Sequence, residues 1–90
     1  RLATACDVFV DEGYFTVEEA RRILTRARAL GLAVKVHADE LVCTNATVLA
    51  CELGALSADH LLKVSPEGIA ALARSETVGV LLPGTAYYLK

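Results

Sequence analysis

The sequence lacks the patterns that mark several common classes of protein. Its three cysteines, Cys6, Cys43 and Cys51, are odd in number and form no C-x-x-C pair. This argues against a disulfide framework and a structural zinc knuckle, and favours reduced thiols in a cytoplasmic protein. No G-x-G-x-x-G or P-loop motif occurs, so we expect no cradle for nucleotide phosphates.

The charge and the length of the hydrophobic runs exclude further partners. The formal net charge is -2, and the basic residues are not gathered into a patch. We therefore expect neither nucleic acid nor an anionic membrane surface as a partner. No apolar run approaches the roughly 18 residues that a membrane-spanning helix needs, so we expect no contact with the membrane interior.

What the chain does have is a large share of aliphatic residues. Hydrophobic residues make up 54% of its 90 positions, without any Trp or Met. This share is high for a small soluble domain, whose surface must be largely polar. It is typical of α/β units in which both faces of the strands are covered. Because the chain also begins at Arg1 rather than Met, we expect residues 1–90 to be part of a larger domain.

Short apolar or β-branched runs alternate with helical patterns along the chain. The expected strands cover residues 7–11, 33–37, 57–61 and 77–82, and the expected helices cover residues 16–30, 45–53 and 65–74. The turn Pro83-Gly84-Thr85 is expected to stop the last strand. This β-α-β-α-β-α-β order is typical of a parallel sheet with right-handed crossovers. Since polar residues follow consecutive strands, the order favours the central half of a (β/α)8 TIM-like barrel over a small open sheet.

Local signals define the ends of these helices. Thr16 followed by Glu19 three residues later forms a capping box, and Gly31 lies where a left-handed C-cap is needed. Thr44 is a candidate cap for the second helix, and Ser65 before a proline begins the third. One apolar stripe is expected on the first helix, at Val17, Ala20, Ile23, Leu24, Ala27 and Leu30.

Three polar residues at strand ends are the candidates for chemistry. His37 ends the second strand, and a neutral imidazole held at such a position is a good ligand for zinc or ferrous iron. Glu40 follows in the next loop and can act as a general base or contact a polar substrate. His60 ends the third strand and can orient a water molecule or stabilise charge on a carbonyl oxygen. We expect the three side chains to converge at one edge of the sheet.

Each polar residue also has a structural interpretation. A lone histidine at a strand end is often a hydrogen-bonded structural residue rather than a metal ligand. Asp39 is best interpreted as a cap for the loop or helix that follows it, and Asp11 and Glu12 as solvated loop acids. Asp59 is expected to point away from His60, because successive side chains of a strand alternate.

Four motifs occur together in the chain. They are Asp7-Val8-Phe9, Lys35-Val36-His37-Ala38-Asp39-Glu40-Leu41, Glu52-Leu53-Gly54-Ala55-Leu56-Ser57-Ala58-Asp59-His60-Leu61 and Leu81-Leu82-Pro83-Gly84-Thr85. Over nearly the whole chain, this set resembles the imidazolonepropionase family of the amidohydrolase superfamily. The resemblance implies a metal-dependent (β/α)8 barrel, with a small β-sandwich built from its terminal parts. It also implies hydrolysis of 4-imidazolone-5-propanoate to N-formimidoyl-L-glutamate in histidine degradation, with one zinc or iron ion.

The resemblance further implies a role for each candidate residue. His37 would be a metal ligand, Glu40 would contact the substrate ring and handle protons, and His60 would lie beside the attacked carbonyl. The family's His-x-His pair of metal ligands and its later Asp ligand have no counterpart in this chain. We therefore expect the 90 residues alone to be inactive, although the whole enzyme acts on a small-molecule substrate.

Two other functions stay open at this point. The chain could belong to another cyclic-amide hydrolase or a deaminase of the same superfamily. It could also be a non-catalytic half-barrel that self-associates, because four strands leave two open edges. A homo-oligomer is therefore possible.

Overall fold

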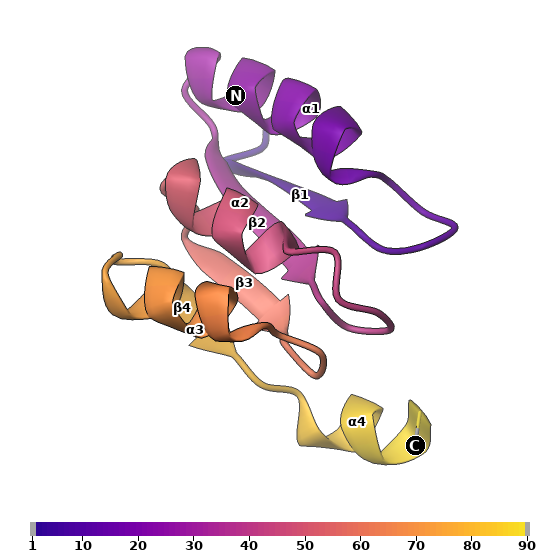
Figure 1. The fold of residues 1–90 in the computed structure, drawn as a ribbon. Helices are drawn as coiled ribbons and strands as arrows, with labels where there is room; N and C mark the ends of the chain where they lie inside the picture. The colour runs from indigo at the N-terminus through magenta and orange to yellow at the C-terminus, as the bar shows by residue number, and fades with distance from the viewer. Residues whose placement is uncertain (1, 90) are drawn as a thin grey trace.

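The computed structural model describes residues 2–89. Along this range, strands and helices alternate (Figure 1): β1 (Ala5–Phe9), α1 (Val17–Ala29), β2 (Ala33–Ala38), α2 (Ala46–Glu52), β3 (Ser57–His60), α3 (Pro66–Ala73), β4 (Val78–Val80) and α4 (Pro83–Leu89). None of the helices in this range is long and apolar enough to cross a membrane.

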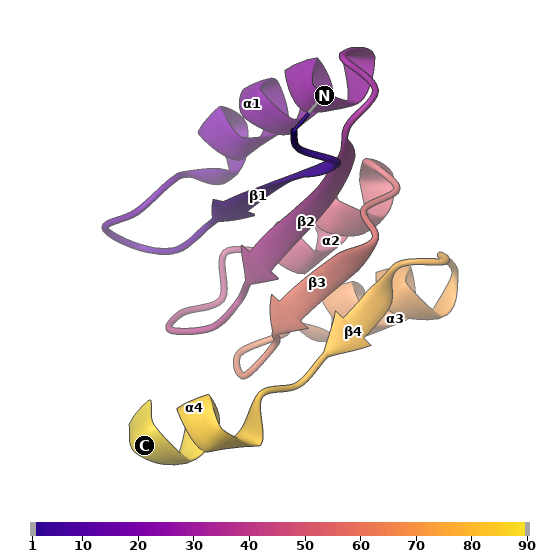
Figure 2. The ribbon, with the colours of Figure 1, turned by 180° about the vertical axis from the view of Figure 1, so that it is seen from behind.

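The strands form one parallel sheet in the order β1-β2-β3-β4. Phe9 of β1 lies opposite His37 of β2, and Ala38 of β2 lies opposite His60 of β3. Helices α1, α2 and α3 cover one face of this sheet, whereas α4 lies beyond the end of β4, as Figure 1 and Figure 2 show from opposite sides. The expected α/β architecture is confirmed as a four-stranded parallel sheet alternating with helices, which is consistent with half of a barrel.

The hydrophobic core lies between the sheet and its covering helices. The buried side chains of this layer include Val8, Val34, Val36, Ala38 and Ala58 from the strands, and Ala20, Leu24, Ala27, Leu49 and Ala50 from the helices. The apolar stripe expected on α1 is buried at its centre. Ile23 and Leu30 at its margins are 37% and 58% exposed, because a helix resting on a sheet buries only part of its circumference.

The ends of α1 follow the sequence closely. The Glu19 N–H donates to Thr16 Oγ1 (3.1 Å) and the Thr16 N–H donates to Glu19 Oε1 (2.9 Å), so the expected capping box is confirmed. The bond from the Thr16 backbone holds the pKa of the Glu19 carboxyl below its ordinary value of 4.5. Its contribution to stability is therefore present above that value and is lost as the pH falls through the lowered pKa. Gly31 has φ 85, which confirms the left-handed C-cap.

Later boundaries differ in part from the expectation. Ser65 caps α3 as expected, since its Oγ accepts the Gly68 N–H at 3.0 Å. The cap of α2 is Asn45 in a left-handed conformation, without a side-chain cap bond, and not Thr44. Pro83 begins α4 instead of a plain turn, because proline is well suited to the first turn of a helix.

The capping box of α1 gives a first prediction. Thr16→Ala should lower the free energy of unfolding by about 1 kcal/mol, because the Glu19 N–H loses its acceptor. Denaturant unfolding of the protein measures this loss. Thr25→Ala, at an exposed position within the same helix, is the matched control and should be neutral or slightly stabilising. Equal losses in the two variants would show that the cap contributes nothing specific.

Candidate functional site

The three candidate residues do meet at one edge of the sheet. Parallel pairing places the carboxyl ends of β2 and β3 side by side, with Ala38 opposite His60. His60 Nδ1 lies 3.5 Å from Glu40 Oε2, and the rings of His37 and His60 have centroids 5.1 Å apart. Glu40 and His60 are each only 7% exposed. The expected convergence of His37, Glu40 and His60 is therefore confirmed, while their chemical roles are taken up below.

The residues at the ends of β2 and β3 have left-handed backbone conformations. Asp39 directly after β2 has φ 51, and His60 and Leu61 at the end of β3 have φ 82 and 64. Non-glycine residues with such angles are uncommon and persist only where the surrounding structure holds them. Asp59 is expected to point away from His60 only while strand alternation persists, and the left-handed φ of His60 does not meet this condition. Both residues lie near His37, since the left-handed turn at His60 ends the strand alternation.

Asp39 holds the loop that carries Glu40. Its side chain is completely buried. Oδ1 accepts the Thr44 N–H (2.7 Å), the Thr44 hydroxyl (3.3 Å) and the Asn45 N–H (3.0 Å). Oδ2 accepts the Thr47 N–H (3.2 Å) and the Thr47 hydroxyl (2.7 Å). The interpretation of Asp39 as a cap is confirmed, and this carboxylate replaces the missing side-chain cap of α2.

Asp11 holds the same loop from the other side. The sequence favoured a solvated acid, and this interpretation is wrong because Asp11 is 3% exposed. Its carboxylate accepts the N–H groups of Leu41 (2.7 Å), Val42 (3.2 Å) and Glu12 (2.8 Å). Asp11 comes shortly after β1, much as Asp39 comes directly after β2. This similar position was the signal in the sequence from which the anchoring role of Asp11 could have been predicted. Two buried carboxylates therefore fix the segment that directly follows Glu40.

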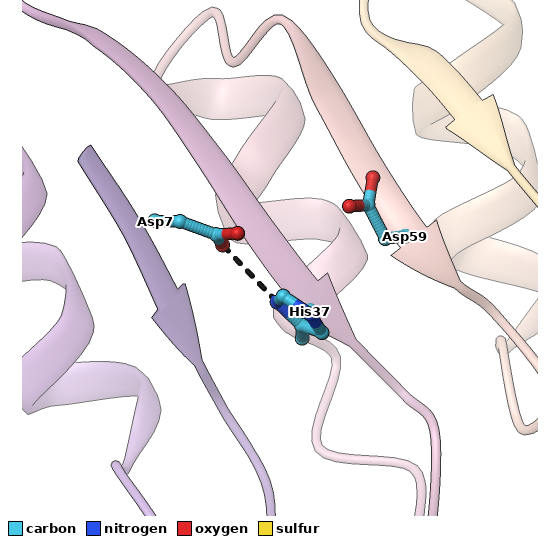
Figure 3. A group of neighbouring side chains, drawn as sticks. All are labelled: Asp7, His37 and Asp59. Atoms are coloured by element: carbon cyan, nitrogen blue, oxygen red, sulfur yellow. Dashed lines mark hydrogen bonds and ion pairs between the residues drawn. The ribbon is translucent and has the colours of Figure 1, made fainter. Parts of the chain in front are cut away.

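A second group of side chains gathers on the open face of the sheet. Asp7, His37 and Asp59 come from three neighbouring strands and lie close together, with the Asp7 carboxylate directed at the His37 ring (Figure 3). His37 Nδ1 lies 3.1 Å from Asp7 Oδ1, and Lys35 Nζ lies 4.0 Å from Asp59 Oδ2. Asp59 Oδ1 is buried and has no hydrogen-bond partner. The sequence interpretation did not include Asp7 or Asp59 in the site, although both follow the alternation that puts them on the face of His37.

The donor set of this group fits a divalent cation. One ligand atom from each of Asp7, His37 and Asp59 lies within 4.8 Å of the other two. Imidazole nitrogen and carboxylate oxygen are ligands that zinc and ferrous iron accept, at roughly 2.0–2.2 Å from zinc. The unpartnered oxygen of Asp59 is also an acceptor without a donor, which a cation would satisfy. His37 is thus placed where a metal could be held.

A separate groove lies on the helical side of the molecule. Its volume is about 930 Å³, and its lining comes from the loops after β1 and β2 together with α1 and α2. Tyr14, Cys43 and Glu52 are among its residues, whereas His37 and His60 are not. The candidate site lies at the sheet edge, because the histidines and the Glu40 carboxylate converge there.

No protein-family model matches the chain. The chain is 54% identical over 90 residues to a protein of Clostridium tetani named imidazolonepropionase. It is 57% identical over 88 residues to one of that name from Symbiobacterium thermophilum, and 55% over 89 residues to one from Porphyromonas gingivalis. These alignments cover 100%, 98% and 99% of this chain. They cover 22%, 21% and 21% of the relatives, so the chain spans about a fifth of their length.

The carboxylate of Asp39 gives a second prediction. Asp39→Asn replaces one acceptor oxygen by an NH2 group that faces donors, so buried N–H and hydroxyl groups lose their partner. We expect a loss of about 2 kcal/mol in the free energy of unfolding and faster amide hydrogen exchange over residues 40–47. Glu40→Gln is the matched control, because the Glu40 carboxylate contacts His60. Unchanged exchange in the Asp39 variant would refute the anchoring role of this side chain.

Proposed function

The chain belongs to the imidazolonepropionase family, and from this premise we propose that it supplies part of the active site of a ring-opening hydrolase. The substrate would be 4-imidazolone-5-propanoate and the product N-formimidoyl-L-glutamate, in histidine degradation. The convergence of His37, Glu40 and His60 carries this proposal. A site of this kind needs a metal ligand beside groups that can move protons, and these residue types meet that need.

We also propose that residues 1–90 are part of a metal-dependent (β/α)8 barrel domain. The four strands are parallel and consecutive, and α1, α2 and α3 cover a single face. In a barrel this face is the outer one, and the functional residues lie at the carboxyl ends of the strands. His37, Glu40 and His60 have this position. The three cysteines are unpaired, in keeping with our proposal of a cytoplasmic enzyme.

His37 is the proposed metal ligand of this chain. A bound zinc or iron ion would supply an activated water molecule and polarise the substrate carbonyl. His37 fits this task because its ring is fixed at a strand end, one-third exposed toward the open face of the sheet. Further ligands from outside residues 1–90 belong to the same proposal, because a catalytic zinc site needs about three protein ligands.

Glu40 and His60 are the proposed proton-handling pair. With 3.5 Å between His60 Nδ1 and Glu40 Oε2, the imidazole and the carboxylate can share a proton. His60 would then use Nε2 to donate a hydrogen bond to the carbonyl oxygen as negative charge develops on it. Glu40 would accept a proton from the attacking water or bind a ring N–H of the substrate. Burial strengthens these interactions, because little water competes for the same groups.

The proposal predicts that substitutions of the three residues differ in their effects on kcat and on bound metal. In the natural protein that carries this chain, Glu40→Gln and His60→Asn should lower kcat by about 10²–10⁴-fold while metal content is retained. His37→Ala should lose bound metal together with activity. Turnover of 4-imidazolone-5-propanoate and elemental analysis of the purified variants measure the two effects.

A control variant separates a local effect from a general one. Glu76 is an exposed acid before β4, at the opposite edge of the sheet. Glu76→Gln should therefore keep the activity of the unchanged protein. The double variant at Glu40 and His60 should lose little more than the worse single variant, since the pair acts as a unit. Full turnover in Glu40→Gln would remove the basis of the proposal.

Self-association of the half-barrel is the second candidate function. In the described sheet β1 and β4 are edge strands, and Val78 and Leu81 at the β4 edge are 59% and 68% exposed. An unpaired strand edge with apolar side chains can pair with another copy. Under this second candidate function, residues 1–90 would form a homo-oligomer without any catalytic activity.

Sedimentation of residues 1–90 tests this second candidate. We expect an oligomer that Val78→Lys converts to a smaller species, because a charged residue on an edge strand opposes pairing. Leu30→Lys is the matched control, since Leu30 is an exposed leucine next to α1, away from the β4 edge. A folded monomer of the unchanged chain at high concentration would exclude self-association.

A further inference from the structure

We propose that Asp7 is a positioning residue for His37, and that it selects which nitrogen of the imidazole is presented to the metal. Its carboxylate would hold the proton on Nδ1, so that Nε2 is the ligand nitrogen. This inference rests on the proposed function of His37 as a metal ligand. The inference adds Asp7 to the site as a residue that acts on the imidazole ring of His37 and not on the substrate.

The strand pairing places Asp7 where it can do this. Asp7 lies opposite Lys35 and Phe9 lies opposite His37 in the parallel pairing of β1 with β2. Because side chains two residues apart share a face, Asp7 and His37 project from the same side of the sheet. Figure 3 shows the carboxylate of Asp7 directed at the ring, and Asp7 Oδ1 lies 3.1 Å from His37 Nδ1.

The chemistry of the two groups fixes the tautomer. An ionised carboxylate has acceptors and no donor, so the hydrogen bond requires a proton on His37 Nδ1. A neutral imidazole carries one ring proton, and its lone pair is then on Nε2. Histidine ligands commonly donate their other ring N–H to a carboxylate, which orients the ring and raises its basicity.

Packing restricts the ring from a second direction. The rings of Phe9 and His37 have centroids 5.5 Å apart, and Phe9 in turn stacks on Tyr14 at 4.3 Å. The ring centroid of His60 lies 5.1 Å from that of His37. The imidazole is therefore held at Nδ1 by Asp7 and against Phe9. The Asp7 side chain is 37% exposed, so its removal should disturb the ring more than the fold.

A competing arrangement uses the same atoms in another way. Asp7 and Asp59 could bind the cation directly together with His37, since their ligand atoms lie within 4.8 Å of one another. In that case Asp7 and Asp59 would be equivalent for metal binding, and Asp7 would not select the tautomer of His37. Asp59 has no hydrogen bond to His37 among the described contacts, which makes it the matched variant for separating the two arrangements.

The test measures the tautomer of His37 in the metal-free natural protein that carries this chain. Ring ¹⁵N spectra at mildly alkaline pH, assigned by the loss of signals in His37→Asn, distinguish Nδ1–H from Nε2–H. We expect the Nδ1–H form in the unchanged protein and in Asp59→Asn. Asp7→Asn should shift the ring toward Nε2–H, because an amide NH2 can donate to Nδ1. Asp7→Ala should give a mixture of both forms.

Zinc binding provides the second measurement. We expect Asp7→Asn and Asp7→Ala to weaken zinc affinity by about 10–100-fold, and Asp59→Asn to weaken it less. An unchanged tautomer in both Asp7 variants overturns the proposal. An equal loss of zinc affinity in the Asp7 and Asp59 variants with the tautomer unchanged also overturns it, in favour of direct ligation.

The two levels of inference can fail separately. If the tautomer responds to Asp7 as expected but the zinc-loaded protein does not open 4-imidazolone-5-propanoate, Asp7 keeps its positioning role and the proposed function fails. If the protein turns over 4-imidazolone-5-propanoate and this activity depends on His37, but the tautomer of His37 is unchanged in the Asp7 variants, the proposed function stands and the positioning role is wrong.

Discussion

The in-register parallel pairing of β2 with β1 and β3 is the constraint on which the site depends. It puts Asp7, His37 and Asp59 on one face, and it puts His60 opposite Ala38, one residue from the turn at Asp39. A shift of one residue in either pairing would move His37 to the face that carries the core. The apolar residues Val34 and Val36 are fully buried against the helices, so the core itself enforces the register.

Two buried carboxylates fix the loop that carries Glu40 next to the paired strands. Asp39 and Asp11 together accept eight hydrogen bonds, seven from residues 41–47 after Glu40 and one from the Glu12 N–H. They also satisfy the backbone N–H groups of a segment that no helix or strand pairs. The cost is the left-handed backbone at Asp39, which is tolerated because the loop is held so firmly. If Glu40 has the proposed proton-handling role, such a loop would keep its carboxylate at a constant distance from His60, as catalysis requires.

Much of this arrangement could be predicted from particular residues. Thr16 and Glu19, Gly31, and Ser65 before Pro66 define helix ends through contacts within a few positions of the chain, and all were confirmed. The meeting of His37 and His60 was also foreseeable, because parallel strands end at one edge. The partners of Asp11 were not, since Leu41 lies 30 residues away. The exposed margins of the α1 stripe likewise depend on how far the sheet reaches beneath the helix.

The sequence by itself determined the alternation of strands and helices and the caps, because these depend on local periodicity and on neighbouring donors and acceptors. It also determined which residue types would stand at the strand ends. Only the tertiary structure decided that Asp59 and His60 share the surroundings of His37, and that Asp7 contacts its ring. The physical reason is that a left-handed turn at His60 and the pairing of separate strands set these directions. Neither is encoded in any single stretch of the chain.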